Sequence, residues 1–456
     1  MANAPGSAAD IGDLGAPAYR VLPNINGMEQ TFCAIHDQCG GCGRVACIVT
    51  FAGPYDRTAI ERALRIVTEQ CPRAGVQLHR QPSGLFEYRI SSAPRRPVIE
   101  FQHVADRDAG YQLAVELGRS NGNSAEPVLR WVVLASEAED GFQIVGIAHH
   151  GVFDAASLLV LVRRFLEVCG STTVPEWEWS EDELPQPRRA TFFRVLGLIL
   201  RHAVTHFRLR NRHCRGLPRE FADEGACVVR RWNPAETEAL LNACRTAQTT
   251  VTAALGVAGA TAVHDVYPEL APVVDVVIPT DTRRYLPAAA AERSVRMGVC
   301  GIVYVVDFRS AGDIGDRSRG ISQSLHRFVA NEGPLRLVHL ATRMVRKRVQ
   351  LLESPPVCVS ANSLGRIRFP ESPSGVRVVE CGWFANGGQH MPAYSQSAAT
   401  IDGCLAVTSY STWISAERVR RLAQRTEEIL RKFADLPMTN AMPALETQPF
   451  EVTAVS

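Results

Sequence analysis

The stretch at residues 146–169, GIAHHGVFDAASLLVLVRRFLEVC, joins two different patterns through a pair of adjacent histidines. The residues before the histidines are apolar and partly β-branched, which is typical of a buried strand. Residues 155–169 then place apolar side chains at helical spacing, so we expect a helix to begin just after Asp154. His149 and His150 therefore lie where a strand ends and a helix begins. Because a rigid scaffold can hold such a loop while exposing its side chains, this segment is the leading candidate for a functional site.

Length and composition indicate a large folded protein. With 456 residues the chain is too long for one average domain, and its 46% hydrophobic and 21% charged residues allow an ample core. The net charge of +2 gives no electrostatic argument for a nucleic-acid partner. The first residues lack the pattern of a secretory signal, and no run of roughly 18 apolar residues indicates a transmembrane segment. The 13 scattered cysteines form no dense disulfide framework, so we expect reduced thiols and a cytoplasmic location.

The rest of the sequence alternates strand and helix patterns, which indicates an α/β protein. A short helix is expected at 26–36, and 56–71 has helical spacing with Asp56 as its N-cap. The runs at 128–136 and 142–148 are predicted to pair antiparallel. Further strands are expected at 45–51, 85–90, 98–104, 273–278, 301–308, 357–360, 376–381 and 405–410. Further helices are expected at 111–118, 234–247, 252–263, 321–330, 335–352 and 416–433.

A reversal of charge near the middle of the chain marks the predicted junction between two halves. Residues 176–183 carry five acidic side chains, whereas 188–215 carry eight arginines, no acid and an apolar helical face. The expected divisions are a disordered tail at 1–19, an N-terminal lobe at 20–185, a basic crossover at 186–222 and a C-terminal lobe at 223–456. The basic stretch is expected either to connect the lobes or to contact a membrane surface, an acidic carrier protein or CoA phosphates.

The histidine pair suits acid–base chemistry. A histidine has an unperturbed pKa of about 6.5, so a rigidly held imidazole can accept a proton at neutral pH. An alcohol that attacks an acyl carbonyl must lose a proton, and an activated thioester donor makes a covalent enzyme nucleophile unnecessary. No G-x-S-x-G segment is evident, which disfavours a standard serine hydrolase. Asp154 is well placed to fix the loop, provided that a cation elsewhere balances its charge.

Residues 149–155, HHGVFDA, resemble the H-H-x-x-x-D-G motif of the condensation-domain superfamily, with Ala155 in place of the usual glycine. This superfamily includes nonribosomal-peptide condensation domains, polyketide-associated and alcohol acyltransferases, and chloramphenicol acetyltransferase. Its further landmarks are matched in order by NGMEQTF at 26–32, DRTAIERALRIVTEQCPRAGVQ at 56–77, DTRRYL at 281–286, NSLG at 362–365 and DGCL at 402–405. The D-F-G-W-G motif of the plant acyltransferase branch is not found, since only Asp307 and Phe308 match its start.

The resemblance implies an α/β fold of two chloramphenicol-acetyltransferase-like lobes, arranged as a V-shaped pseudo-dimer with a central tunnel. It also implies that His150 is the catalytic histidine at the centre of this tunnel and that His149 is its supporting neighbour. Asp154 is expected to be structural and to pair with Arg283 from the other half, with the adjacent Arg284 as the alternative partner. Removal of Arg283 is therefore expected to destabilise the site.

Other polar residues leave alternatives open. The C-x2-H-x2-C-x2-C pattern at 33–42 has the residue types of a zinc site, but its spacing is unusually compact and no metal site is predicted. Asn362 and Ser363 are candidates for hydrogen bonding to a developing oxyanion, although a turn role fits as well. His390 is a candidate substrate-binding residue on the tunnel wall.

The predicted function is that of a free-standing acyltransferase of nonribosomal-peptide, polyketide or other specialised-metabolite biosynthesis. It would move an acyl group from acyl-CoA or an acyl-carrier protein to a hydroxyl or amine acceptor, giving an ester or an amide. No tightly bound cofactor is expected, because the thioester of CoA or phosphopantetheine is itself a substrate. Peripheral membrane contact remains an alternative role for the basic stretch. The rival function is a non-catalytic condensation-like domain that binds a carrier protein or recruits a partner enzyme.

Overall fold

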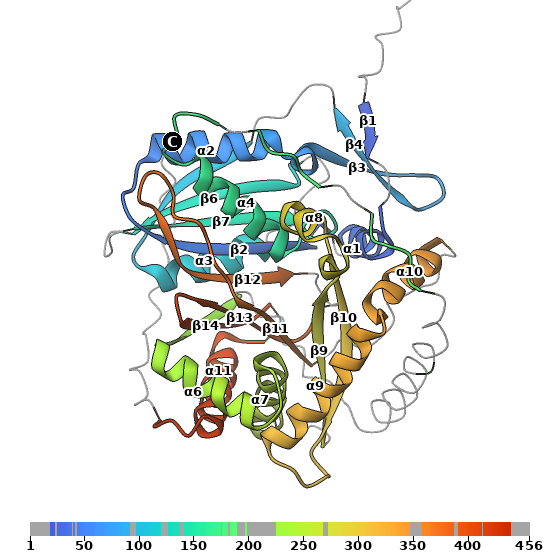
Figure 1. Cartoon of the computed structure of the whole chain (residues 1–456), viewed down its shortest axis with the longest axis vertical. Helices are drawn as coiled ribbons and strands as arrows, with labels where there is room; N and C mark the ends of the chain where they lie inside the picture. Colours follow the sequence, from blue (N-terminus) through green and yellow to red (C-terminus); the bar gives the residue numbers. More distant parts are fainter. Residues whose placement is uncertain are drawn as a thin grey trace, which may run out of the picture.

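The computed structural model builds the chain from stacked sheets with helices on their outer faces (Figure 1). It describes residues 19–22, 25–38, 40–41, 43–91, 97–119, 126–136, 141–174, 176–180, 183–188, 197, 225–267, 272–346, 358–386, 391–412 and 414–438. The predicted tail at 1–19 and the predicted crossover at 186–222 therefore lie almost entirely outside the described residues. No helix in the described ranges combines the length and the apolar character that crossing a membrane requires.

The first large sheet carries the histidine segment. Its strand order is β12-β2-β7-β6-β5, and β6 pairs antiparallel with β7, which confirms the predicted pairing. The strands are β12 (Arg377–Asn386), β2 (Arg44–Ala52), β7 (Phe142–His149), β6 (Leu129–Ser136) and β5 (Val98–Val104). Helices lie on both faces of this sheet, namely α2 (Arg57–Gln70) and α4 (Ala155–Val168) on one face and α3 (Arg107–Arg119) on the other.

Alternation along β2 explains why both faces of the first sheet are covered. Successive side chains of a strand point to opposite faces, and β2 is apolar at nearly every position. One set of β2 side chains enters the core shared with α2 and α4: Val45, Cys47, Val49 and Phe51. The intervening residues Ala46 and Ile48 enter the core shared with α3.

The second large sheet has the strand order β10-β9-β11-β13-β14-β8. Its strands are β10 (Val299–Asp307), β9 (Val273–Asp281), β11 (Val359–Arg366), β13 (Tyr394–Ile401), β14 (Cys404–Ser411) and β8 (Ala226–Trp232). A separate hydrophobic core fills the space between this sheet and its helices. These helices are α6 (Pro234–Thr246), α7 (Val251–Val266), α9 (Ile314–Ala330) and α11 (Ala416–Phe433).

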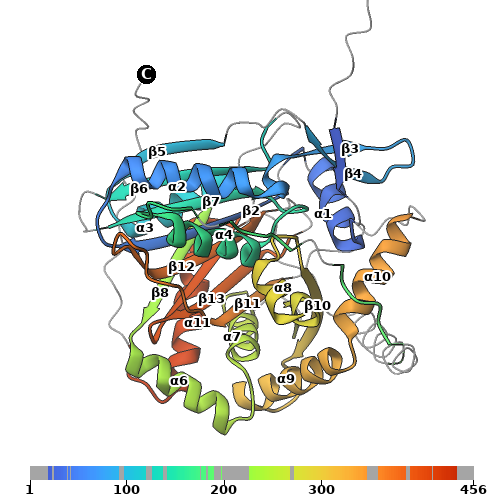
Figure 2. The same cartoon turned by 45° about the horizontal axis from the view of Figure 1, so that its top comes forward.

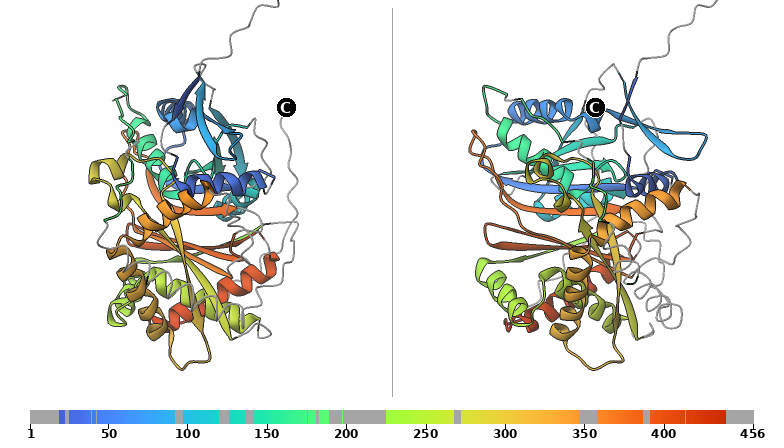
Figure 3. Two further views of the ribbon diagram at one scale, coloured as in Figure 1. Left: turned by 90° about the vertical axis from the view of Figure 1, so that its right-hand side faces the viewer. Right: turned by 45° about the vertical axis from the view of Figure 1, so that its right-hand side comes forward.

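The two layers share one strand, because β12 belongs to the second half of the chain but lies in the first sheet. It pairs antiparallel with β2 from Arg377 opposite Ala52 to Asn386 opposite Arg44. Figure 3 shows β12 at the boundary where the two sheets stack. The predicted C-terminal lobe at 223–456 thus supplies an edge strand to the sheet of the predicted N-terminal lobe.

A group of shorter elements lies beside the end of the first sheet that carries the histidines (Figure 2). A small sheet has the order β1-β4-β3, and helix α1 packs against α10. The elements are β1 (Tyr19–Leu22), β4 (Phe86–Ser91), β3 (Val76–Arg80), α1 (Gly27–Gln38), α10 (Gly333–Arg346), the 3-10 turns η1 (Pro72–Gly75) and η3 (Arg283–Tyr285), and α8 (Ala288–Arg293).

Candidate active site

The histidine pair is held by the backbone at the end of β7. The His149 N–H donates to the Val128 carbonyl at 2.8 Å, and the His150 N–H donates to the Gly43 carbonyl at 3.0 Å. The chain then turns, because the N–H groups of Val152 and Phe153 both donate back to the His149 carbonyl. Both imidazoles are turned inward, with only 7% of His149 and 6% of His150 exposed.

The hydrogen bonds of the two rings require opposite neutral tautomers. His150 Nδ1 lies 3.1 Å from the Phe153 carbonyl, which can only accept, so Nδ1 carries the proton. His149 Nδ1 instead accepts from the Gly151 N–H at 3.0 Å, so its proton is on Nε2. His150 Nε2 thus bears a lone pair, and no described residue hydrogen-bonds to it. Of the two histidines, His150 is the one that can act as a base through Nε2.

Burial keeps both rings neutral. Burial lowers the pKa of His149 well below its ordinary value, and the nearby His36, His150 and Arg44 lower it further. Burial also lowers the pKa of His150, although the Phe153 carbonyl and the Asp154 carboxylate oppose this effect. A neutral imidazole is the form that accepts a proton, so the site is in its basic form near neutral pH.

Helix α1 places two rings against the pair. The Phe32 ring lies over His150 with 4.3 Å between ring centroids, and the His36 ring lies over His149 with 4.0 Å between centroids. His36 in turn donates from Nδ1 to the Gly43 carbonyl at 3.2 Å, on the segment that enters β2. The orientation of both histidines is therefore set partly by α1.

Gly151 lies close against α1. A side chain here would place its Cβ 2.6 Å from Cys33 Sγ and 3.0 Å from His149 Cε1. The Gly151 carbonyl accepts from the Tyr88 hydroxyl at 2.6 Å, and Cys33 Sγ lies 3.7 Å from the same hydroxyl. Only glycine fits this approach without displacing the histidine ring or the helix.

Asp154 closes the loop and starts α4. Its side chain accepts from the Ser157 N–H at 2.8 Å, and the Ser157 hydroxyl is 3.3 Å from the Asp154 N–H, which forms a capping box. Arg283 binds the same carboxylate through both terminal nitrogens, at 3.0 and 2.7 Å. The structure thus brings together Asp154 and Arg283, whereas the Arg284 side chain is exposed and donates to the Asp281 carbonyl.

The charge of Asp154 is fully compensated. Its side chain is 1% exposed, and burial alone would raise the pKa of the carboxyl. The Arg283 guanidinium and the N–H groups of Gly298 and Ser157 outweigh burial and hold the pKa of Asp154 below its usual range. The same pairing raises the pKa of Arg283 despite its burial. Both groups therefore remain charged, as a buried pair must to be stable.

The segment 294–298 joins the second half of the chain to the histidine loop. The Met297 N–H donates to the Val152 carbonyl at 3.1 Å, and the Gly298 N–H donates to Asp154 at 2.8 Å. The Arg296 carbonyl accepts from the Ser157 hydroxyl at 3.0 Å and from Arg283. Residues from both predicted halves thus form one network around the loop.

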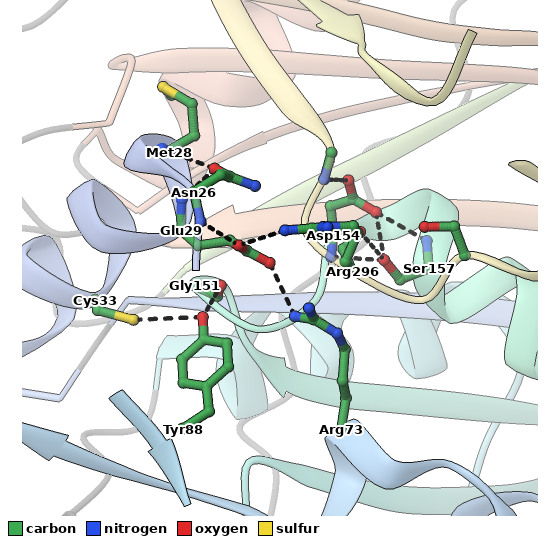
Figure 4. A network of polar contacts seen from close by, with 12 residues as sticks. Asn26, Met28, Glu29, Cys33, Arg73, Tyr88, Gly151, Asp154, Ser157 and Arg296 are labelled. Atoms are coloured by element: carbon green, nitrogen blue, oxygen red, sulfur yellow. Dashed lines mark hydrogen bonds and ion pairs between the residues drawn. The ribbon is translucent and has the colours of Figure 1, made fainter. Parts of the chain in front are cut away.

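The sequence singles out neither Glu29, Arg73 nor Arg296, yet they form a buried ion cluster at the site. Glu29 Oε1 lies 2.8 Å from Arg73 Nη1, and Glu29 Oε2 lies 3.0 Å from Arg296 Nη2. Figure 4 shows the Glu29 carboxylate in contact with both guanidinium groups, with Arg296 on the side of Asp154 and Ser157. The available signal was weak: Glu29 and Arg73 fall inside two of the matched landmarks, and nothing in the sequence indicates that they meet.

Among the described residues, Asn362 and Ser363 make no hydrogen bond or ring contact with the two histidines. Asn362 and Ser363 lie half-buried on β11, where a bulge follows Ser363, and the Ser363 hydroxyl accepts from the Gly365 N–H at 3.2 Å. His390 lies outside the described residues, as do Cys39 and Cys42 of the cysteine-rich pattern. Among the residues that the structure describes, no His, Cys, Asp and Glu side chains gather in a metal-binding group.

Comparisons with known proteins agree with this architecture. The family model described as phthiocerol/phthiodiolone dimycocerosyl transferase C-terminus matches residues 227–420. No curated protein matches the chain significantly. TRI3 trichothecene 15-O-acetyltransferase from Fusarium sporotrichioides is 12% identical, with a TM-score of 0.67 over 91% of this chain and 95% of its own. The first condensation domain of the calcium-dependent antibiotic synthetase is 14% identical, with a TM-score of 0.65 over 91% and 97%.

Polyketide synthase associated protein 5 from Mycobacterium tuberculosis is also similar, at 13% identity and a TM-score of 0.61 over 92% of this chain and 100% of its own. The chain therefore has the two-lobed α/β fold of these solved structures, which confirms the predicted fold class, and the family match together with these structures confirms the predicted resemblance. Within that class, the match to a transferase family supports the predicted acyltransferase class of enzyme.

Proposed function

We propose that this protein is an acyltransferase that moves an acyl group from a thioester to a hydroxyl or amine acceptor. The donor is acyl-CoA or an acyl group on a carrier-protein phosphopantetheine arm, and the setting is specialised-metabolite biosynthesis in the cytoplasm. Similar proteins support this choice, since one is an O-acetyltransferase and the matched family is described as a dimycocerosyl transferase.

The observation that carries the proposal is the state of His150. Its Nδ1 is fixed by the Phe153 carbonyl, while Nε2 has no hydrogen-bond partner among the described residues and retains its lone pair. A ring nitrogen without a protein partner is available to water or to a substrate group. The hydroxyl or amine of an acceptor is such a group. His149 cannot take this role through Nδ1, because Nδ1 already accepts from Gly151.

The reaction balances with His150 as the single proton carrier. As the acceptor oxygen or nitrogen bonds to the thioester carbonyl carbon, its proton moves to His150 Nε2 and the carbonyl oxygen becomes an oxyanion. Collapse of this tetrahedral intermediate breaks the carbon–sulfur bond, and the imidazolium returns the proton to the leaving thiolate. This chemistry requires no tightly bound cofactor. Asn362, Ser363 and His390 remain our candidates for contacts with the substrates in the tunnel.

Asp154 and Arg283 position the histidine loop and do not take part in proton transfer. Both Arg283 nitrogens and the Gly298 N–H are used to hold the Asp154 carboxylate, which points to the start of α4. Their contribution is to keep the loop, and hence the His150 ring, at a fixed position relative to the two substrates.

The test is a panel of acyl-CoA and acyl-carrier donors with alcohol and amine acceptors, read by mass spectrometry for released thiol and new product. His150→Ala is compared with His326→Ala, which removes an exposed histidine on α9. We expect His150→Ala to lower kcat by roughly 10²–10⁴-fold and His326→Ala to have no effect. Unchanged product formation by folded His150→Ala would refute the role of His150 as the base and favour the non-catalytic alternative.

A further inference from the structure

Helix α1 presents one continuous face to the candidate site. Glu29, Phe32, Cys33 and His36 follow the i, i+3, i+4, i+7 spacing of a single helix face. Each of these side chains meets a different part of the site: two arginines, the His150 ring, the Tyr88 hydroxyl and the His149 ring. The position of α1 therefore contributes to the orientation of both imidazoles.

The anchor of this helix is the Glu29 carboxylate, whose residue is 0% exposed. One oxygen binds Arg73 of η1 at 2.8 Å, and the other binds Arg296 at 3.0 Å. Arg296 lies in segment 294–298, whose backbone also contacts Val152 and, through the Arg296 carbonyl, Arg283. A single carboxylate thus links the helix that holds the histidine rings to the segment that holds the Asp154–Arg283 pair.

We propose that Glu29 is a positioning residue for acyl transfer, which sets the His150 ring by tying α1 to the segment that carries Arg296. This inference rests on the proposed function, but it concerns how the base is oriented and not which group is the base. Loss of the Glu29 charge releases the two buried guanidinium groups from their shared partner. Helix α1 then shifts, Phe32 moves relative to His150, and Nε2 leaves its productive position.

A simpler role for Glu29 would be to cap its own helix. The Asn26 side chain accepts from the Glu29 N–H at 3.0 Å, and Glu29 Oε2 accepts from the Asn26 N–H at 2.7 Å. This is a capping box, and a glutamine at the same position also completes one. The substitution Glu29→Gln therefore keeps the cap while it removes the charge, and one of the two acceptor oxygens, that face Arg73 and Arg296.

The matched control is Glu380→Gln, which also removes a buried carboxylate from an arginine. Glu380 on β12 binds Arg231 of β8 at 2.5 and 3.1 Å. It lies opposite Thr50 on β2, six residues from Arg44, which is opposite His149. That separation is about 20 Å along the strand. Glu380→Gln therefore weakens an ion pair between a buried carboxylate and a more exposed arginine, far from the histidines.

The kinetic test compares the two variants at equal loss of thermal stability. We expect Glu29→Gln to lower kcat by about 10–100-fold with KM for both substrates changed less than about threefold, because a small misplacement of the base slows the chemical step. Glu380→Gln should leave kcat within about twofold. Equal kcat values for the two variants would overturn the proposal, as would a change confined to KM.

A measurement that does not depend on enzymatic activity tests this inference separately from the proposed function. The Phe32 ring shifts the NMR resonance of His150 Cε1–H, and Phe32→Leu identifies that ring-current contribution. We expect Glu29→Gln, and the milder Arg296→Met, to change this resonance while Glu380→Gln leaves it in place. An unchanged resonance in both site variants would overturn the positioning role. If instead the resonance moves but His150→Ala remains active, the positioning inference stands and the proposed function fails.

Discussion

At the scale of single residues, two neighbouring histidines with the same side chain are made chemically different by their hydrogen bonds. A carbonyl faces Nδ1 of His150, whereas an N–H group faces Nδ1 of His149. These partners leave a free Nε2 lone pair on His150. The sequence predicts the location of the pair and, by resemblance, the choice of His150. It does not predict the tautomers, because these depend on how the loop turns back at Gly151 and Phe153.

The first prediction concerns pH. Burial lowers the pKa values of His36, His149 and His150, so the folded protein keeps these rings neutral where the unfolded chain binds protons. Between about pH 6.5 and 5 the unfolded state binds more protons than the native state, so the free energy of unfolding falls as the pH is lowered. This contribution is complete above about pH 7. Urea unfolding at a series of pH values measures it.

The same pKa shift of His150 controls activity. The value of kcat/KM reports the free enzyme, so its acidic limb should have an apparent pKa below about 6.5. An unfolding free energy that increases from pH 7 to 5, or an acidic limb centred above pH 7, would contradict the neutral, buried state of these rings.

At the scale of the elements, the start of α4 depends on a residue 129 positions away. The Asp154 cap is predictable from the sequence, because an aspartate precedes a run with helical spacing. The family resemblance predicts Arg283 as the partner of Asp154, but local pattern alone does not separate Arg283 from the adjacent Arg284, because the choice depends on which of them η3 turns inward. The sequence does not predict the ion cluster of Glu29 either, because its three members come from distant segments that meet only after folding.

The second prediction compares the two adjacent arginines. Arg283→Met leaves the buried Asp154 carboxylate without its cation, so we expect the free energy of unfolding to fall by about 3–5 kcal/mol. Arg284→Met removes an exposed side chain and should change it by less than about 0.5 kcal/mol. Chemical denaturation of both variants measures the difference. Similar losses for the two variants would show that the Asp154–Arg283 pair does not secure the loop.

Most elements are predictable from local pattern, and the exceptions have physical causes. The helix at 416–433 is confirmed with identical bounds, and 56–71 corresponds to α2 with Asp56 as its N-cap. The sequence predicts neither β13 nor β8. The first is rich in serine and alanine although every residue in it is buried, and the second carries Arg230 and Arg231, which form ion pairs. Hydrophobic periodicity does not detect strands of this composition.

At the scale of the whole molecule, the two layers are interlocked and not simply joined end to end. Strand β12 comes from the second half of the chain and is an edge strand of the first sheet. The Ser397 hydroxyl on β13 donates to the Trp383 carbonyl on β12 at 3.1 Å, which connects the sheets directly. The sequence predicts a strand at 376–381 but not its destination, because pairing across sheets depends on the complete fold.

The third prediction follows from this interlocking. Strand β12 lies between β11 and β13 in the chain and contacts β13, so unfolding of either layer disrupts contacts made by the other. We therefore expect a single cooperative transition in scanning calorimetry, with equal calorimetric and van't Hoff enthalpies. Two resolved transitions would show instead that the layers unfold independently.

The most direct test of the account is the protonation of each ring nitrogen, measured by long-range ¹H–¹⁵N NMR of ¹⁵N-histidine-labelled protein near pH 7.5. His150→Ala and His149→Asn assign the two sets of resonances. We predict a proton on Nδ1 and a free lone pair on Nε2 for His150, with the opposite tautomer for His149. A proton on Nε2 of His150 would contradict this prediction, because that nitrogen could not then accept the proton of an acyl acceptor.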